Sequence, residues 1–243
     1  HSFPTRRSSD LLAEVVEGDI ALEIGPGLGS LTLALLENSH QVLAVEIDNR
    51  LANQLPNTVE KHGFDSKKLI VLNQDAMGLM QLPDKPTVLV ANLPYNISSP
   101  LLFHLVAAAS EIDEQVFMLQ AEVVERMVAK AGSSDFSRLS VMLQARYDME
   151  LVLEVPPEAF DPQPKVNSAV VRMIPRKDFN LTDAQWSALE KVVAAAFSQR
   201  RKMLRTNLQS FADRIQLTET ELKARAQDIS VDRYMEWARI LAA

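Results

Sequence analysis

The chain has 243 residues, a mass of 27.1 kDa and a formal net charge of −7. Hydrophobic residues make up 47% of it, enough for a sizeable core, and the absence of cysteine excludes disulfide scaffolds, iron–sulfur clusters and cysteine nucleophiles. The four histidines are not spaced as metal ligands, no apolar run could span a membrane, and residues 1–10 lack the apolar core of a signal peptide. We therefore expect a cytoplasmic protein without a metal and without a membrane anchor. The sequence carries no signal for an oligomeric state, so a monomer is the default expectation.

The first three quarters of the chain alternate between apolar runs typical of buried strands and runs typical of helices. Strands are predicted at residues 20–24, 41–47, 69–73, 87–91, 115–120, 151–155 and 168–174. Helices are predicted at residues 31–36, 51–62, 100–109, 121–130 and 138–147. Apolar strands separated by helices favour parallel pairing with both faces covered, so the predicted class is an open α/β sheet.

The pattern changes towards the C-terminus. Four of the twelve prolines lie within residues 156–164, where they stiffen a loop in which we expect no helix. From Leu181 onward only helices are predicted. Their candidate N-caps are Thr182 or Asp183, Thr218 and Ser230. We place the domain boundary near residues 176–180, which gives a first domain of residues 1–178 and a small helical domain of residues 179–243.

The negative charge is unevenly distributed. Residues 11–125 hold 16 Asp or Glu against 5 Lys or Arg, whereas residues 126–243 hold 15 against 18. Residues 191–212, predicted as a basic helix, contain no acidic residue. Their basic residues are Lys191, Arg200, Arg201, Lys202 and Arg205. A local electropositive face of this kind allows a nucleic-acid partner despite the acidic total.

Three of the seven glycines lie within residues 25–29, after the first predicted strand and before a helix. At Gly25 and Gly27, glycine permits a tight turn and lets a ligand approach the backbone at the carboxyl end of the strand. The spacing G-x-G-x-G differs from the dinucleotide fingerprint G-x-G-x-x-G. The loop alone therefore leaves the identity of the ligand open.

Acidic residues follow the next two predicted strands. Glu46 can accept hydrogen bonds from both hydroxyls of a ribose, as found in any adenosine-containing cofactor, and Asp48 is its nearby competitor. Asp75 could reach the exocyclic amine of an adenine, and a turn or helix-cap role fits its position equally well.

The segment Asn92-Leu93-Pro94-Tyr95 follows the fourth predicted strand and narrows the chemistry most. The Asn92 carbonyl and a backbone carbonyl can accept both protons of a planar exocyclic amine, which frees the nitrogen lone pair to attack a methyl group. Tyr95 can stack on a base that has been unstacked to reach the pocket. The structural alternative is a plain turn built by Asn and Pro.

Motifs along the chain resemble, in order, those of the ribosomal RNA adenine N6,N6-dimethyltransferase family, the KsgA/RsmA type. They are Leu22–Gly29, Asn92–Ser98, Glu122–Arg126, Arg138–Val141, Val155–Pro157, Phe160–Val171 and Phe197–Lys202. The resemblance covers about residues 15–243. It implies a Rossmann-like, seven-stranded S-adenosylmethionine-dependent methyltransferase sheet with a small all-helical C-terminal domain that binds RNA.

The resemblance also implies dimethylation of N6 of two adjacent adenosines near the 3′ end of small-subunit (16S) ribosomal RNA, coupled to biogenesis of the small ribosomal subunit. For the cofactor it implies Gly25, Gly27, Glu46, Ile47, Asp75, Ala76 and Asn92. For the target adenine it implies Asn92, Leu93, Pro94, Tyr95 and Phe160, with the two aromatic rings sandwiching the base. For the RNA backbone it implies Arg200, Arg201, Lys202 and Arg205. The structural alternative for Phe160 is a buried anchor of the proline-rich loop.

Residues 1–12 differ from the family, whose members open with a basic segment containing Phe-x-Gln-Asn-Phe-Leu that helps to close over the cofactor. We expect a truncated start carrying foreign residues; a genuine start of this kind would weaken cofactor binding. Ala121 also differs, because members often carry Lys there.

Other functions fit fewer of these motifs. An Erm-like enzyme acting on large-subunit RNA shares the cofactor and target motifs, but Arg138–Val141 and Phe197–Lys202 favour the small-subunit enzyme. A DNA adenine methyltransferase would need a DNA-reading module, and a nicotinamide-dependent oxidoreductase has no use for the segment 92–95. A non-catalytic ribosome assembly factor remains an alternative, against which the intact Glu46, Asp75 and Asn92 argue.

Overall fold

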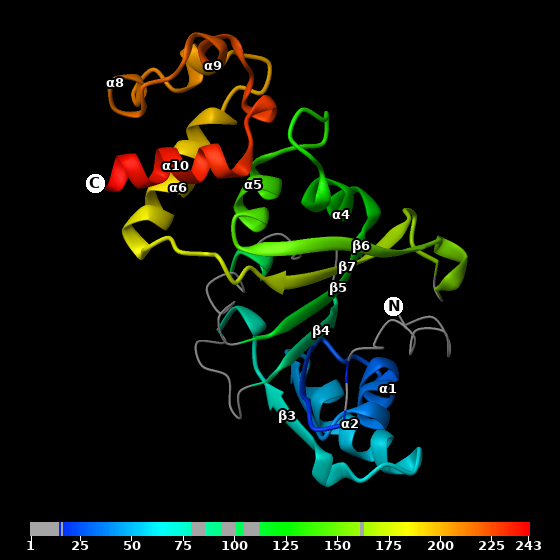
Figure 1. The fold of residues 1–243 in the computed structure, drawn as a ribbon. Coiled ribbons are helices and arrows are strands. Elements are labelled where there is room, and N and C mark those ends of the chain that lie inside the picture. The colour runs from blue at the N-terminus through cyan, green and yellow to red at the C-terminus, as the bar shows by residue number, and fades with distance from the viewer. Residues whose placement is uncertain (1–14, 16, 79–85, 94–100, 105–111, 161–162) are drawn as a thin grey trace. The chain divides into compact units, whose positions relative to one another are not determined.

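The computed structural model describes residues 15, 17–78, 86–93, 101–104, 112–160 and 163–243. The chain forms a seven-stranded sheet in the order β3-β2-β1-β4-β5-β7-β6 (Figure 1). Its strands are β1 (Ile20–Ile24), β2 (Gln41–Glu46), β3 (Leu69–Asn73), β4 (Val88–Asn92), β5 (Glu114–Gln120), β6 (Tyr147–Val155) and β7 (Ser168–Pro175). The first five strands pair in parallel, and β7 runs antiparallel to β5. The predicted α/β class with seven strands is confirmed.

The helices that alternate with these strands also follow the prediction, with bounds that differ by a few residues. They are α1 (Ser30–Asn38), α2 (Asn49–Lys61), α4 (Ala121–Val128) and α5 (Arg138–Gln144). Of the helix predicted at residues 100–109, the structure describes residues 101–104, which are helical. Figure 1 shows α1 and α2 beside the β1–β3 part of the sheet.

The inner strands β1 and β2 are buried because their side chains are covered on both faces of the sheet. In β1 the four residues after Ile20 are all buried, and in β2 the five residues after Gln41 are buried. Leu35 of α1 and Leu55 of α2 belong to the same hydrophobic core as the β2 residue Val42. Burial on both faces explains why these strands read as continuous apolar runs without alternation.

The proline-rich segment departs from the prediction in one detail. Residues Pro157–Ala159 form a short 3-10 turn that begins with proline, although we expected no helix there. A proline at the first helical position loses no hydrogen bond, because the N–H at that position has no partner within a helix. The prolines therefore limit this helix to a single turn without preventing it.

After β7 the described chain is helical, as predicted. The helices are α6 (Asp183–Ala196), α7 (Leu204–Asn207), α8 (Ala212–Ile215), α9 (Glu219–Lys223), a 3-10 turn at Ala226–Asp228, and α10 (Val231–Ala242). The predicted caps are confirmed, since the side chains of Thr182, Thr218 and Ser230 accept backbone hydrogen bonds from Gln185, Glu221 and Arg233, respectively. Thr182 is the cap and Asp183 the first residue of α6.

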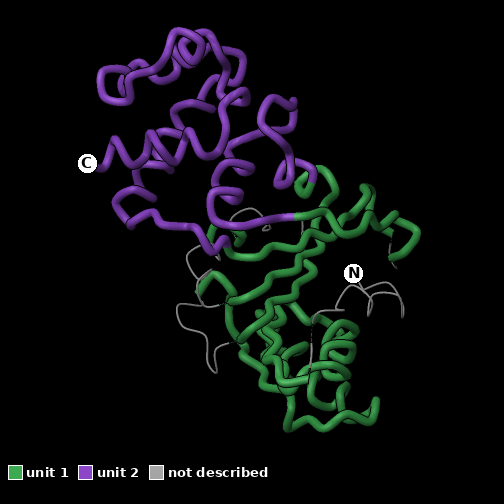
Figure 2. The backbone as a smooth tube through the Cα atoms, viewed as in Figure 1, with its two compact units in different colours: residues 1–124, 150–175 green, residues 125–149, 176–243 purple. Residues whose placement is uncertain are grey.

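The chain separates into two compact units (Figure 2). Unit 1 comprises residues 1–124 and 150–175, and unit 2 comprises residues 125–149 and 176–243. Unit 2 therefore includes residues 125–149 in addition to the C-terminal helices. The aromatic side chains of its core explain this: the fully buried Phe136 lies 6.4 Å from Phe197, which lies 6.1 Å from Tyr234, measured between ring centroids. A domain boundary at residue 178 stays a prediction beside this division.

Candidate cofactor and target site

The predicted cofactor residues lie at one edge of the sheet in unit 1. Ile24 at the end of β1 pairs with Val45 of β2 on one side and Ala91 of β4 on the other. Glu46 at the end of β2 pairs with Asn73 at the end of β3. Because these strands are parallel, the loops that follow them all begin at this edge. The strand order reverses between β1 and β4, and ligands of open α/β sheets bind at such a switch point.

The glycine loop needs glycine for two different reasons. Gly25, Gly27 and Gly29 have φ angles of 72°, 55° and 90° in the left-handed region, which side chains rarely adopt. A methyl group at Gly25 or Gly27 would meet nothing within 4 Å, whereas one at Gly29 would lie 2.7 Å from Cδ1 of Leu55. The first two glycines therefore leave open space for a ligand, while Gly29 lets α2 pack against the start of α1.

Glu46 is held in place by the backbone of two loops. Its Oε2 accepts a hydrogen bond from Gly27 N at 3.1 Å, and its Oε1 accepts one from Asp48 N at 2.9 Å. Each carboxylate oxygen has a second lone pair, so a fixed Glu46 can still accept ribose hydroxyls. The competitor Asp48 is engaged as the N-cap of α2, where it accepts from Arg50 N and Leu51 N. The geometry thus favours Glu46 over Asp48.

Asn73 supports the same site and was missed by the sequence reasoning. Its Nδ2 donates to the carbonyl oxygens of Glu46 at 2.8 Å and Ile47 at 3.3 Å, which fixes the end of β2. An asparagine directly at a strand end was the available signal, but the sequence does not say which neighbouring strand it will contact.

Large apolar side chains are exposed beside the polar residues of this edge. Leu28 of the glycine loop and Ile47 after Glu46 are each 69% exposed, and Met77 after the Asp75–Ala76 pair is 43% exposed. Asp75 is itself exposed, and its Oδ1 accepts from Met77 N at 2.9 Å within a tight turn. Carboxylates beside exposed apolar side chains suit an adenosine, which has hydroxyl groups and an apolar ring face.

Asn92 ends β4 at the same edge and is half-buried. The next residue, Leu93, is 1% exposed, and its N–H donates to the carbonyl oxygen of Met118 in β5 at 3.3 Å. The backbone that carries the predicted amine-binding carbonyl is therefore anchored to the sheet. Pro94 and Tyr95, predicted beside it, lie outside the described residues.

Phe160 lies in the hydrophobic core of unit 1. It is 5% exposed and belongs to the same buried cluster as Val155, Met118 and Val170. This position corresponds to the buried loop anchor, the alternative to stacking on a base. To stack on a base, the ring would have to leave this core, and that role stays a prediction.

Glu23 is a buried residue of β1, two positions before Gly25 of the glycine loop, and the sequence analysis gave it no role. It is 1% exposed, and its Oε2 accepts a hydrogen bond from Thr32 Oγ1 at 2.6 Å. Burial raises the pKa of Glu23 to about 8, the Thr32 hydrogen bond opposes this rise, and the charge of Glu46 adds to it. The group can therefore retain a proton well above the usual range of a carboxylic acid.

The predicted basic helix over residues 191–212 is wrong as a continuous helix. α6 ends at Ala196, and the next helix, α7, begins at Leu204. Residues 198–203 between them are all exposed and so offer no apolar face on which a further helical turn could pack. Arg200, Arg201 and Lys202 therefore lie in a turn of unit 2, which we name the basic turn (residues 198–203).

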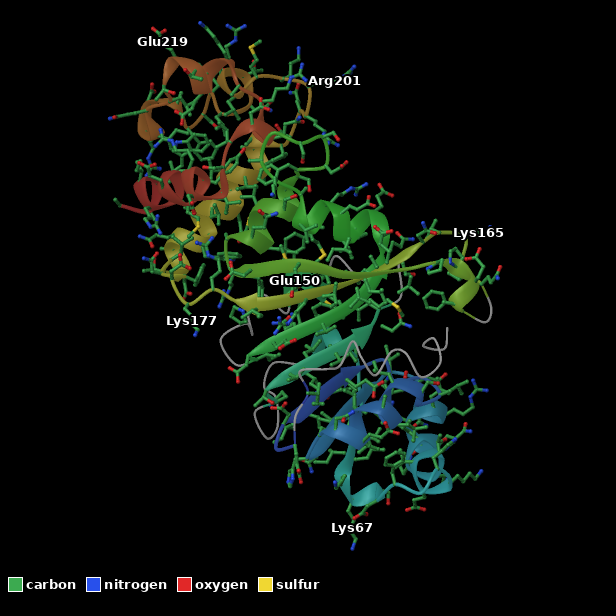
Figure 3. All side chains as sticks on the ribbon, turned by 45° about the vertical axis from the view of Figure 1, so that its right-hand side comes forward. Lys67, Glu150, Lys165, Lys177, Arg201 and Glu219 are labelled. Atoms are coloured by element: carbon green, nitrogen blue, oxygen red, sulfur yellow. The ribbon has the colours of Figure 1, made fainter. Side chains whose placement is uncertain are left out.

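The four predicted RNA-binding cations are exposed, and one of them has an internal partner. The Arg200 guanidinium donates to the backbone carbonyl of Ser134. Arg201 points away from the helices of unit 2 (Figure 3), and Lys202 and Arg205 are exposed as well. In the described part of the chain no His, Cys, Asp or Glu residues gather in a group that could hold a metal ion. Of the helices described, none is long and apolar enough to cross a bilayer.

Known proteins identify the family. The sequence model of the family described as ribosomal RNA adenine dimethylase matches residues 10–243. Ribosomal RNA small subunit methyltransferase A of Bordetella petrii is 50% identical over 225 residues, covering 90% of this chain and 82% of the relative. The protein of the same name from Burkholderia lata is 49% identical over 237 residues, covering 93% and 84%.

Solved structures agree with the fold. A dimethyladenosine transferase from Plasmodium falciparum has a TM-score of 0.82 at 25% identity, covering 98% of this chain and 96% of that one. The 23S rRNA methyltransferase ErmE has a TM-score of 0.73 at 24% identity, covers both chains completely, and shares the fold. The chain belongs to the ribosomal RNA adenine dimethylase family of S-adenosylmethionine-dependent methyltransferases.

Proposed function

We propose that this protein transfers two methyl groups from S-adenosylmethionine to N6 of each of two adjacent adenosines near the 3′ end of small-subunit ribosomal RNA. The observation that carries the proposal is the placement of Asn92 at the end of β4, next to the glycine loop of β1 across the switch point of the sheet. The relatives named ribosomal RNA small subunit methyltransferase A support small-subunit RNA as the substrate, rather than large-subunit RNA.

The residues at the carboxyl edge fit S-adenosylmethionine. Glu46, fixed by Gly27 N and Asp48 N, would accept the ribose hydroxyls, and Asp75 would accept the adenine amine. Ile47 would cover one face of the adenine, as its exposure at the site allows. Gly25, Gly27 and Ala76 would approach the cofactor through their backbones. When bound, the cofactor supplies a methyl group already activated by a positively charged sulfur.

Asn92 would act on the amine of the target base. Its side-chain carbonyl and the backbone carbonyl of Leu93 or Pro94 would accept both N6 protons and hold the nitrogen lone pair towards the methyl group. The new N–C bond would form as the S–C bond breaks, with the sulfur keeping the bonding electrons, and one N6 proton would then be lost to solvent. Because Leu93 N donates to Met118 O, the peptide between Asn92 and Leu93 would be held on the sheet during the transfer. Tyr95 would stack on the base, and Phe160 would do so once its ring had left the core of unit 1.

Unit 2 would hold the RNA through its backbone. Arg200, Arg201, Lys202 and Arg205 would neutralise phosphates, which gives an affinity that falls with salt concentration. RNA helices are recognised mostly through shape and backbone, so a basic turn suits this role without contacting bases. We further propose that the protein acts as a monomer, in the cytoplasm where small subunits assemble.

The direct test is methyl transfer from labelled S-adenosylmethionine to unmethylated small ribosomal subunits, followed by mass spectrometry of the nucleosides. We expect N6,N6-dimethyladenosine with the unchanged protein and with Asn53→Ala, an exposed asparagine of α2, and none with Asn92→Ala. Methylation of large-subunit RNA alone would support the Erm-like alternative. Binding to small subunits without methyl transfer would support an assembly factor.

A further inference from the structure

The C-terminal end of α6 is completed by a side chain from the next helix. The last four carbonyl groups of a helix have no partner within it. Asn207 of α7 supplies one, because its Nδ2 donates to the carbonyl oxygen of Ala196 at 2.6 Å. The same Nδ2 donates to the carbonyl oxygen of Gln199 at 3.1 Å. One amide group thus links the last residue of α6 to the basic turn.

The basic turn has further backbone ties at its far end. Lys202 N donates to Gln199 O at 2.9 Å, and Leu204 N donates to Ala224 O at 2.9 Å. Its six side chains are exposed, so the turn is not packed into the core. The direction in which Arg201 and Lys202 project therefore depends on these hydrogen bonds, together with the one from Arg200 to Ser134 O. Gln199 O accepts from both Asn207 and Lys202 and so joins two of them.

The hydrogen bonds that Asn207 donates stabilise the end of α6, and leucine would lose them, but the asparagine also carries a cost. Its Oδ1 is buried and has no hydrogen-bond partner among the described residues. A buried acceptor without a partner destabilises the fold, and an apolar side chain of similar volume would remove that cost. The two donated hydrogen bonds are thus accompanied by a cost that leucine would not have.

We propose that Asn207 is a positioning residue that holds the basic turn in the conformation in which its cations meet RNA phosphates. The inference rests on the proposed function, in which this turn binds the small-subunit RNA. A turn ordered before binding loses less conformational entropy when it binds, and this raises affinity without adding a contact.

The test uses the full chain with Asn207→Leu, and with Asn207→Ala as a second variant that removes the same donors if leucine does not fit. Asn180→Ala is the matched control, because Asn180 is also an asparagine of unit 2 with a side-chain hydrogen bond, to Arg239. RNA affinity is measured on unmethylated small subunits over a range of salt concentrations. Cofactor affinity and the unfolding midpoint are measured on the same samples.

We expect Asn207→Leu to weaken RNA binding roughly two- to tenfold, the effect of one or a few groups that must be ordered on binding. KM for the subunit rises by the same factor, whereas kcat, cofactor affinity and the Asn180→Ala control stay unchanged. Unchanged RNA affinity in both Asn207 variants would overturn the inference.

A double-mutant cycle separates a positioning role from a general structural one. In the background Arg201→Glu plus Lys202→Glu, two of the three cations of the basic turn are gone and only Arg200 remains, so Asn207→Leu should have a much smaller effect on RNA affinity. An equal loss in both backgrounds would show that Asn207 acts elsewhere, and would overturn the inference while leaving the proposed function intact. If the charge reversal itself leaves RNA binding unchanged, the role of the turn and the role of Asn207 fail together, while methyl transfer by the Asn92 site is unaffected.

Discussion

Replacing Gly29 with alanine should destabilise unit 1 through two separate effects. The backbone of Gly29 has a φ of 90°, which costs an L-residue about 1–2 kcal/mol. The added methyl group would also lie 2.7 Å from Cδ1 of Leu55, a side chain of α2 that is 1% exposed. Overpacking of a filled core typically costs about 1–3 kcal/mol. The expected loss is therefore about 2–5 kcal/mol of unfolding free energy.

Gly63 provides the matched comparison. It lies in the same unit with a φ of 85°, but a methyl group there would meet nothing within 4 Å. Gly63→Ala should therefore cost only the backbone contribution of about 1–2 kcal/mol. Both variants are measured by urea denaturation, with the slope m checked so that the midpoints report stability. Equal losses for the two glycines would refute the packing part of the argument.

Leu55 supplies a second check on the same reasoning. Leu55→Ala alone should cost about 2–5 kcal/mol, because it leaves a cavity in a packed core. Together with Gly29→Ala it should cost less than the sum of the two, since the methyl group then has room. Leu55→Ala should be additive with Gly63→Ala. Additivity in both pairs would show that α2 does not restrict the Gly29 position.

Three further predictions concern single side chains. Glu46→Gln should weaken S-adenosylmethionine binding about ten- to a hundredfold, because hydrogen bonds to a charged group contribute about 1.5–3 kcal/mol. The affinity is measured by calorimetry, and an unchanged value would contradict the proposal that Glu46 binds the ribose. Glu23 keeps its proton in the folded state to a pKa of about 8 but releases it near 4.5 when unfolded, so its contribution to stability falls as pH rises between these values. Glu23→Gln should therefore gain stability relative to the unchanged protein from pH 5 to pH 8, by at most about 1.4 kcal/mol per pH unit; parallel curves would contradict the raised pKa. The hydrogen bond from Arg233 lowers the pKa of Glu221, so this pair stabilises unit 2 above the unfolded pKa of 4.5 and ceases to do so as pH falls through the folded value. Arg233→Met should cost about 1–3 kcal/mol at pH 7 and less at pH 3, and the same loss at both pH values would argue against the ion pair.

The sheet could be predicted because each strand of the core carries its own signal. Residues 20–24 and 69–73 were predicted with the observed bounds. The continuous apolar run of the first is what burial on both faces requires, whereas the second is an edge strand with one buried residue, Leu69, and its run of β-branched and leucine residues gave the signal. Which segments of the chain form unit 2 could not be predicted in the same way. Phe136 lies between helices α4 and α5, and its burial against Phe197 depends on a contact across 61 positions of sequence that no local pattern encodes.

The site shows the same limit at the level of single atoms. The sequence offered Glu46 and Asp48 as candidates for the proposed ribose ligand, because both lie at the end of the second strand. The choice depends on hydrogen bonds that the order of residues does not specify: Asp48 caps α2, whereas Glu46 is fixed by Gly27 N from the loop after a different strand. Asn73 and Asn207 were missed for the same reason, since each acts on backbone carbonyls whose position only the folded chain defines.

Side chains that contact a ligand and side chains that fix the backbone of a binding loop differ in how they can be found from the sequence. The side chains proposed to touch the cofactor or the base, such as Glu46 and Asn92, follow the strand ends and can be found by motif. Side chains that fix the backbone of those loops are polar groups that contact carbonyls or amides eight or more residues away, and their spacing varies with loop length. Variants of the second kind should alter affinities and KM before they alter kcat, because they change how often the binding surface is correctly formed and leave the reacting groups in place.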